Sequence, residues 1–496
     1  MLVVPNEFPT QELPYRLALI GEAPGADEEV QGKPFVGATG RLLNALLPQC
    51  DIRRSACFVG NISQVRPPGN KIEALRYDGE EIQAGLKQLK ADIDFVKPNA
   101  IFLMGRLSVL AAGIPIQIEK KSDDDTAFTI SSYRGSIFKC RDLASPFYGY
   151  KCIAGLHPAY VMRNYDTIPL FTFDLQRARR EADFGDLRLT QRHFDLDLTT
   201  SDLCRRLDAI SESDLVSIDI EGGIATGVRC VGISLSATTG FIITFHDRGL
   251  DEQARLFRAL ARVLSSPSIP KVLQNSLYDN FVLSWLFKMP IRNVVHDTML
   301  SGWEIYPELP KGLGTQTSIW TDQPYYKNER KSIDPRTLHA YCCTDSSVTW
   351  EIADKHRQYL DNPAFHPINI KTGKTHAREH FDFNMSLLPI FHYMELKGIR
   401  YNSQLAKEKL DIVTVEMTEL KSRFDQFARC DLNPNSPKQM CDVLYSKLGY
   451  EPQYTKEHGR KTDKRTANKE ALLNLLKDDS TSFTYWLLKW KALEGQ

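Results

Sequence analysis

The chain has 496 residues, of which 42% are hydrophobic and 25% charged, a balance typical of a globular protein and, at this length, of about three domains. Lys and Arg number 62, as do Asp and Glu, so the formal net charge is zero and any nucleic-acid site must concentrate positive charge locally. The ten cysteines form no CxxC pair, the N-terminal residues lack a secretory signal, and no apolar run approaches roughly twenty residues. We therefore expect a cytoplasmic protein with free thiols and no membrane partner.

Four short apolar runs in the first third of the chain predict β-strands, each followed by a polar loop. They cover residues 15–20, 56–60, 100–104 and 150–154. Open α/β sheets bind ligands in the loops that follow their strands. We expect an α/β domain over residues 1–185, with these polar loops gathered on one edge of its sheet.

The same loops carry four motifs that resemble those of the family-4 uracil-DNA glycosylases. The motifs are GEAPG at residues 21–25, GKPFVG at 32–37, RPPGN at 66–70 and HPAYVMRN at 157–164. The resemblance implies a three-layer α/β/α domain that extrudes a uracil from DNA and reads its edge.

The resemblance also implies site residues. Phe35 would stack on the base, Asn61 would read the uracil edge, and His157 would stabilise charge on the departing base. Glu22 and Asn70 would lie on loops that face the deoxyribose of the target nucleotide and the attacking water. Arg66 and Arg163 would contact phosphates of the DNA.

Family-4 glycosylases hold an iron–sulfur cluster on four cysteines, two of them in an N-terminal CxxC, and this sequence departs from that pattern. Residues 1–20 contain no cysteine, and the cysteines of the first domain do not reproduce the spacing: Cys50, Cys57, Cys140 and Cys152. Because a cluster of this kind needs four thiolates, we expect no iron–sulfur cluster. Two interpretations stay open: an active glycosylase on uracil or a modified pyrimidine, or a DNA-binding module with an idle pocket.

Residues 215–221 (LVSIDIE) predict a strand that Gly222 and Gly223 end. Asp219 and Glu221 are two apart, so their side chains share a face of the strand. Adjacent carboxylates repel unless a cation lies between them, and hard oxygen ligands suit Mg²⁺ or Mn²⁺. Taken alone, this acidic pair also fits a solvated strand end.

Two later segments each place polar residues four apart, a spacing that a helix brings onto one face. The pairs are Asn275 with Asp279 and Tyr341 with Asp345. With the earlier Asp-x-Glu, their order and separation resemble the three motifs of the DnaQ-like 3′–5′ exonucleases, as found in the proofreading domain of family-A DNA polymerases. The resemblance implies an RNase-H-like mixed-sheet domain over residues 190–365, with Asn275 in contact with DNA.

The resemblance further implies hydrolysis of a terminal phosphodiester with two Mg²⁺ or Mn²⁺ ions about 3.5–4 Å apart. Asp219 would contact both ions. Glu221 and Asp345 would hold the ion that activates water, and Asp279 would lie in the outer shell of the other. Tyr341 would orient the attacking water.

Other residues of this region have structural interpretations. Alternating residues 229–236 and the run 241–245 predict further strands, which gives an antiparallel start to a mixed sheet. Asp297 and Thr298 resemble the family's structural Asp-Thr pair before a helix. Tyr278 either belongs to the core, which is the interpretation we favour, or stacks on a base.

The last hundred residues begin with a polar, basic linker at 366–380, followed by a helix that runs from Phe383 to Gly398. Residues 394–402, 433–440 and 461–466 resemble the opening of a family-A polymerase domain, whose helices form the thumb. We expect a mostly helical thumb segment over residues 380–496. No following segment supplies palm carboxylates or fingers residues, so we expect no nucleotide addition by this chain alone.

The whole chain thus resembles the N-terminal part of a bacteriophage-type family-A DNA polymerase with an appended glycosylase-like domain. Its expected function is proofreading in DNA replication, with DNA and a separately encoded palm-and-fingers chain as partners. Two alternatives stay open: a non-catalytic DNA-clamping subunit of a separate polymerase, and a freestanding repair nuclease and glycosylase.

Overall fold

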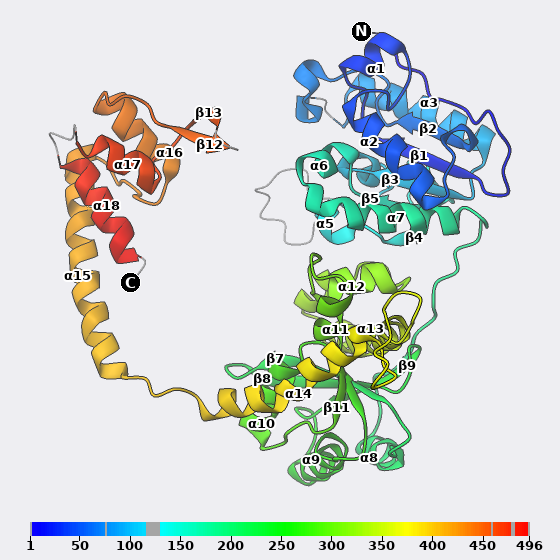
Figure 1. Cartoon of the computed structure of the whole chain (residues 1–496), viewed down its shortest axis with the longest axis vertical. Helices are drawn as coiled ribbons and strands as arrows, with labels where there is room; N and C mark the ends of the chain where they lie inside the picture. The colour runs from blue at the N-terminus through cyan, green and yellow to red at the C-terminus, as the bar shows by residue number, and fades with distance from the viewer. Residues whose placement is uncertain (1, 75–76, 116–128, 458–459, 478–481, 495–496) are drawn as a thin grey trace. The chain divides into compact units, whose positions relative to one another are not determined.

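The computed structural model describes residues 2–74, 77–115, 129–457, 460–477 and 482–494. The chain divides into two compact units, Met1–Lys397 and Gly398–Gln496. The first unit contains two β-sheets flanked by helices, and the second is mostly helical (Figure 1). The expected α/β fold class is confirmed.

The first sheet has five strands in the order β2-β1-β3-β5-β4, and only β4 runs antiparallel to its neighbour. The strands are β1 Leu17–Gly21, β2 Cys57–Asn61, β3 Ala100–Met104, β4 Ile137–Lys139 and β5 Lys151–Gly155. Every residue of the four parallel strands is buried. Parallel strands with both faces covered read as continuous apolar runs, which is how the sequence shows them.

Helices cover both faces of this sheet. Leu17 and Leu19 point into a core shared with helices α2 and α7, whereas Ala18 and Ile20 point into the opposite core, shared with α3. The α-helices are α1 Ala26–Gln31, α2 Ala38–Leu46, α3 Glu80–Val96, α4 Arg106–Leu110, α5 Ile130–Tyr133, α6 Pro158–Arg163 and α7 Ile168–Glu181, with 3₁₀ turns η1 Leu47–Cys50, η2 Arg54–Ala56, η3 Pro68–Asn70, η4 Ile72–Ala74 and η5 Tyr165–Thr167. This is a three-layer α/β/α arrangement.

The second sheet has six strands in the order β11-β10-β7-β8-β9-β6. The strands are β6 His193–Asp195, β7 Val216–Gly223, β8 Gly227–Ser234, β9 Thr239–Thr244, β10 Lys271–Leu273 and β11 Val294–Asp297. Strands β7, β8 and β9 are antiparallel, while β10 and β11 on one side and β6 on the other pair in parallel. The mixed sheet with an antiparallel start is as expected.

Helices α8, α9 and α10 fill the core on one face of this sheet, and α13 packs on the other face against β7, β8 and β9. The helices of this region are α8 Thr200–Ala209, α9 Leu250–Leu264, α10 Ser276–Phe287, α11 Thr298–Ile305, α12 Leu313–Trp320, α13 Pro335–Leu360 and α14 His376–Lys397, with the 3₁₀ turn η6 Lys327–Lys331. Gly232 on β8 allows the close approach of α13, because a Cβ there would lie 2.7 Å from the carbonyl oxygen of Cys342.

The second compact unit is mostly helical, with one β-hairpin. Its elements are α15 Ser403–Ala428, α16 Pro437–Cys441, the π-helical turn η7 Asp442–Lys447, β12 Tyr454–Glu457, β13 Arg460–Arg465, α17 Lys469–Leu475 and α18 Phe483–Glu494. Phe424 of α15 and Phe483 of α18 pack edge to face at 5.3 Å between centroids, in the middle of the unit's core. Among the residues that the structure describes, none of the helices combines the length and apolarity that a membrane span requires.

Three local expectations were wrong. Strand β7 does not end before its two glycines, since Gly222 pairs with Val228 and Gly223 with Gly227. Helix α10 begins at Ser276, so Asn275 precedes it with φ 59° instead of sharing its face with Asp279. Helix α14 starts within the stretch expected to be a linker, because tertiary packing buries its Ala377 and Phe381.

Candidate functional site

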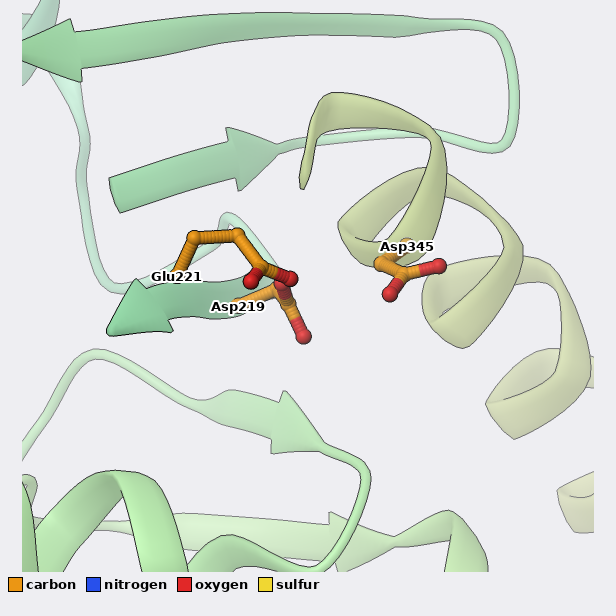
Figure 2. A group of neighbouring side chains, drawn as sticks. All are labelled: Asp219, Glu221 and Asp345. Carbon is orange, nitrogen blue, oxygen red and sulfur yellow. The ribbon is translucent and has the colours of Figure 1, made fainter. Parts of the chain in front are cut away.

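Three carboxylates from the second sheet and its covering helix converge. Asp219 and Glu221 leave the same face of β7, and Asp345 faces them from α13 (Figure 2). One oxygen of each lies within 4.8 Å of the other two. Three hard oxygen donors at this spacing fit a divalent cation such as Mg²⁺ or Mn²⁺.

Burial and mutual repulsion make this cluster electrostatically unfavourable without a cation. Burial first, and then the charge of Asp345, raise the pKa of Asp219 well above its usual value. Burial also raises the pKa of Glu221, although Arg330 opposes that shift. A cation held between the oxygens would favour the ionised forms.

The remaining exonuclease-motif residues surround the cluster. Tyr341 lies one turn before Asp345 on α13, and burial followed by the charge of Asp345 raises the pKa of its phenol far above the usual range, which keeps the hydroxyl protonated. Asp279, on α10, is outside the group within 4.8 Å, yet its charge contributes to the raised pKa of Asp219. Burial raises the pKa of Asp279 itself to about 8.

Asp297 organises the helix starts beside the cluster, as expected for a structural residue. Its carboxylate accepts hydrogen bonds from the backbone of Asn275 at 3.2 Å and of Ser276 at 2.7 Å, where α10 begins. It also caps α11 by accepting from the backbone of Met299 at 2.8 Å. Asn275 is thereby held in its left-handed conformation.

Of the two interpretations of Tyr278, the favoured one, a core residue, was wrong, and stacking on a base stays a prediction. The side chain is 47% exposed, and its hydroxyl donates to the carbonyl oxygen of Gly222 at 2.9 Å, beside the end of β7. It lies in the first turn of α10 on the solvent side, whereas its neighbour Asp279 is buried.

Sequence reasoning missed three residues that contact the carboxylates, all near the turn η6. The Tyr326 hydroxyl donates to Asp345, and Lys327 Nζ donates to both oxygens of Asp345 at 2.6 and 2.7 Å. Arg330 Nε donates to Glu221 Oε2 at 3.3 Å. In the sequence these residues form only a polar, basic stretch with no recognisable spacing.

A cavity of about 880 Å³ opens at the carboxyl edge of the first sheet. It brings together the residues that the sequence marked for base binding and one of those marked for DNA: Glu22, Phe35, Asn61, Asn70, His157 and Arg163. Each lies at the end of a strand, or on a loop or short helix that follows one, at that edge, which explains why residues far apart in the sequence meet.

Asn61 is the polar anchor of this cavity. It ends β2 with 5% of its surface exposed, and its Oδ1 has no hydrogen-bond partner among the described residues. Gly21 makes room for it, because a Cβ there would lie 2.5 Å from Asn61 Oδ1 and 2.4 Å from Phe35 Cζ. A buried polar atom without a partner is rare and points to a ligand or water.

His157 presents a defined face to the cavity. Its Nδ1 accepts a hydrogen bond from the backbone of Ala159 at 3.1 Å, at the start of α6. Burial lowers the pKa of the ring, so the neutral ring carries its proton on Nε2 and can donate there. The rings of His157 and Phe35 are 6.2 Å apart.

The loop that carries Phe35 is fixed by two residues that sequence reasoning missed. Glu28 accepts from the backbone of Val36 at 3.0 Å and of Gly37 at 2.7 Å. Arg54 donates to the Phe35 carbonyl oxygen at 3.2 Å, and Phe35 itself has φ 53°. Both contacts depend on chain folding and leave no local signal.

The other predicted residues support the cavity wall. Glu22 accepts from the backbone of Leu107 at 3.0 Å. Arg66 lies behind Asn70, donating to its Oδ1 at 2.6 Å and pairing with Glu29 at 3.2 Å. Arg163 is exposed at the end of α6, where a phosphate can reach it.

The cysteines of the first domain do not fit a four-thiolate cluster. Cys50 and Cys57 lie in the core on one face of the sheet, whereas Cys140 and Cys152 lie in the core on the other. Burial raises the pKa of Cys57 to about 12 and of Cys50 to about 11, which disfavours the thiolates that ligation requires.

Comparison with known proteins finds two kinds of relative. The Uracil DNA glycosylase superfamily matches residues 9–181. The chain is 31% identical over 150 residues to the type-4 uracil-DNA glycosylase of Thermotoga maritima, covering 30% of this chain and 67% of that protein. It is 25% identical over 266 residues to DNA polymerase I of Pseudomonas aeruginosa, covering 49% of this chain and 28% of that protein.

Among solved structures, the POL domain of Pol1 from M. smegmatis, in complex with DNA primer-template and dNTP, aligns with 61% of this chain and 48% of that chain at 18% identity and a TM-score of 0.43. The chain spans about half to two thirds of the length of the first three glycosylases it matches. It spans less than a third of the DNA polymerase I proteins.

Proposed function

The chain belongs to the uracil DNA glycosylase superfamily through residues 9–181, and from that premise we propose a DNA-processing enzyme with two sites. One is a metal-dependent 3′–5′ exonuclease centre at Asp219, Glu221 and Asp345. The other is a uracil-reading cavity in the first sheet domain. Similarity to DNA polymerase I supports a role of the first site in proofreading.

The observation that carries the exonuclease is the convergence of three carboxylates from two elements, within 4.8 Å, with Glu221 and Asp345 buried, Asp219 half-buried and a protonated tyrosine one helical turn away. Asp219, Glu221 and Asp345 would hold the cation, with Asp279 next to them. A divalent cation at such a site supplies Lewis acidity and neutralises charge on a phosphodiester. The Tyr341 hydroxyl can orient water toward the terminal phosphate.

Digestion of single-stranded DNA labelled at its 5′ end tests the exonuclease. Purified protein with Mg²⁺ or Mn²⁺ should shorten the strand stepwise from its 3′ end, and EDTA should stop it. Asp219→Ala with Glu221→Ala should lower the rate by several orders of magnitude, because the charge stabilisation of the cation is lost. Glu212→Ala, an exposed carboxylate just before β7, is the matched control. Activity that survives the double substitution would refute the assignment.

The uracil-reading cavity rests on a second observation: the unpartnered oxygen of buried Asn61 and the ring of His157, with its Nε2–H, line the same cavity. An amide can accept and donate at the edge of a pyrimidine, and Phe35 offers a stacking face. A uracil-containing duplex distinguishes the two uses of the cavity. Excision that Asn61→Ala or His157→Ala removes identifies a glycosylase, whereas uracil-dependent binding without excision identifies a reader.

The same proposal includes DNA as the partner of both sites.

A further inference from the structure

The ammonium group of Lys327 lies against Asp345, one of the three carboxylates of the cluster. It donates to both Asp345 oxygens at 2.6 and 2.7 Å and lies 3.2 Å from the Tyr341 hydroxyl. The rings of Tyr326 and Tyr341 flank it, each with its centroid 5.0 Å from Nζ. The lysine is therefore held in place by five contacts with three residues of the site.

Such an ammonium group and a divalent cation compete for the same carboxylate. Asp345 has two oxygens, and Lys327 uses both. A cation bound to either oxygen would lie a few ångströms from the ammonium, in a site where Asp345 is only 6% exposed and screening by water is weak. Departure of Lys327 from Asp345 thus favours loading of the cation.

The structure also shows where Lys327 can go. Its side chain is 21% exposed, so its end reaches the mouth of the site, and Arg330 on the same turn is 61% exposed beside Glu221. A phosphodiester entering to reach the carboxylates meets these two positive groups first. The ligand that fits these two positive groups is a phosphate of a nucleic-acid strand.

We propose that Lys327 couples cation loading to DNA binding: it holds Asp345 while the site is free of DNA and transfers to a phosphate of the bound strand. Lys327 is then a positioning residue of the exonuclease, and the inference rests on the exonuclease function proposed above. Because such coupling is reciprocal, DNA raises the affinity for the cation by the same factor as the cation raises the affinity for DNA.

Mn²⁺ binding, followed by electron paramagnetic resonance of the free ion, tests this without any turnover. The protein is titrated alone and with a short single-stranded DNA whose 3′-terminal linkages are phosphorothioates. Without DNA, Lys327→Met should bind Mn²⁺ roughly tenfold more tightly than the wild type, within the usual range of coupling between two ligands. The gain in affinity on adding DNA should be smaller in the variant by about the same factor.

Two further variants separate the outcomes. Lys327→Arg keeps a positive charge, so its Mn²⁺ affinity and DNA response should stay close to those of the wild type. Lys288→Met removes a charge from an exposed lysine at the end of α10 and should change neither.

The failures of the two proposals are distinguishable. If Lys327→Met and Lys288→Met both match the wild type with and without DNA, the coupling is refuted while the cation site stands. If the wild type binds no Mn²⁺, or binds it equally well after Asp219→Asn, the exonuclease assignment itself falls. Thermal unfolding of each variant shows that the comparison is made on folded protein.

Discussion

Asp219→Asn should stabilise the protein against unfolding in EDTA, and it should abolish the extra stability that a divalent cation gives to the wild type. The substitution keeps the shape of the side chain and removes one of three charges whose oxygens lie within 4.8 Å of one another. Two unit charges at that separation repel by about 3.5 kcal/mol at an effective dielectric constant of about 20. Asp219 faces two such neighbours.

Two effects reduce the net gain. Lys327 and Arg330 offset part of the repulsion, and the raised pKa of Asp219 allows its carboxyl to take up a proton. We therefore expect Asp219→Asn to raise the free energy of unfolding by about 2 kcal/mol at neutral pH, which corresponds to about 4–8 °C in Tm for a domain of this size.

The sign of the pH dependence follows from the direction of the pKa shift. A carboxyl whose pKa is raised in the folded state stabilises the fold in acid and loses that contribution as pH rises through the folded pKa. The advantage of Asp219→Asn over the wild type should therefore be smallest in acid and grow as the pH is raised.

Thermal unfolding in EDTA and in saturating MgCl₂ provides the assay. Mg²⁺ should stabilise the wild type by about 2.7 kcal/mol when present at a hundred times its dissociation constant, and should leave Asp219→Asn nearly unchanged. Glu212→Gln, outside the cluster, should follow the wild type in both buffers. The reasoning fails if Asp219→Asn is no more stable than the wild type in EDTA, or if Mg²⁺ stabilises both equally.

Three other predictions follow from single sites. Burial lowers the pKa of Lys271 to about 8, so Lys271→Met should raise the free energy of unfolding by about 2 kcal/mol at neutral pH. Urea titrations should show that this gain shrinks between about pH 8 and 10, because the lysine of the folded wild type becomes neutral there. Gly21→Ala would place a Cβ 2.4 Å from Phe35 and 2.5 Å from Asn61, so it should abolish uracil-dependent DNA binding while exonuclease activity persists; unchanged binding in a gel-shift assay would contradict the assigned cavity. Elemental analysis of the purified protein should find no stoichiometric iron, and an absorbance band of an iron–sulfur cluster would overturn that expectation.

Much of the fold was readable because its strands have strong local patterns. The four parallel strands of the first sheet are buried on both faces and appear as unbroken apolar runs, and Ala100–Met104 was located to the residue. Asp219 and Glu221 share a face because the period of a strand is two, and Tyr341 and Asp345 because the turn of a helix is close to four residues. Where a site is assembled from the ends of such elements, spacing alone is informative.

The missed features depend on contacts across the chain. Asn275 has φ 59° because Asp297, far along the sequence, holds the backbone at the start of α10, and no local pattern distinguishes this from a first helical turn. Helix α14 starts early because Phe381 finds a buried position, which overrides the polar composition around it. Long-range hydrogen bonds, such as those of Glu28 and Arg54 to the Phe35 loop, leave no periodic trace.

The zero net charge of the whole chain hides an imbalance at the carboxylate cluster. Asp219, Glu221, Asp279 and Asp345 carry four negative charges when ionised, and Lys327 and Arg330 form ion pairs with Asp345 and Glu221. While Lys327 holds Asp345 and DNA is absent, the ionised cluster thus keeps two excess negative charges, which is the charge that one divalent cation would balance. A phosphodiester at the mouth of the site attracts Lys327 away from Asp345, and the carboxylate that Lys327 leaves then favours the cation. The order in which DNA and the cation bind thus depends on Lys327, a residue that no sequence motif identified.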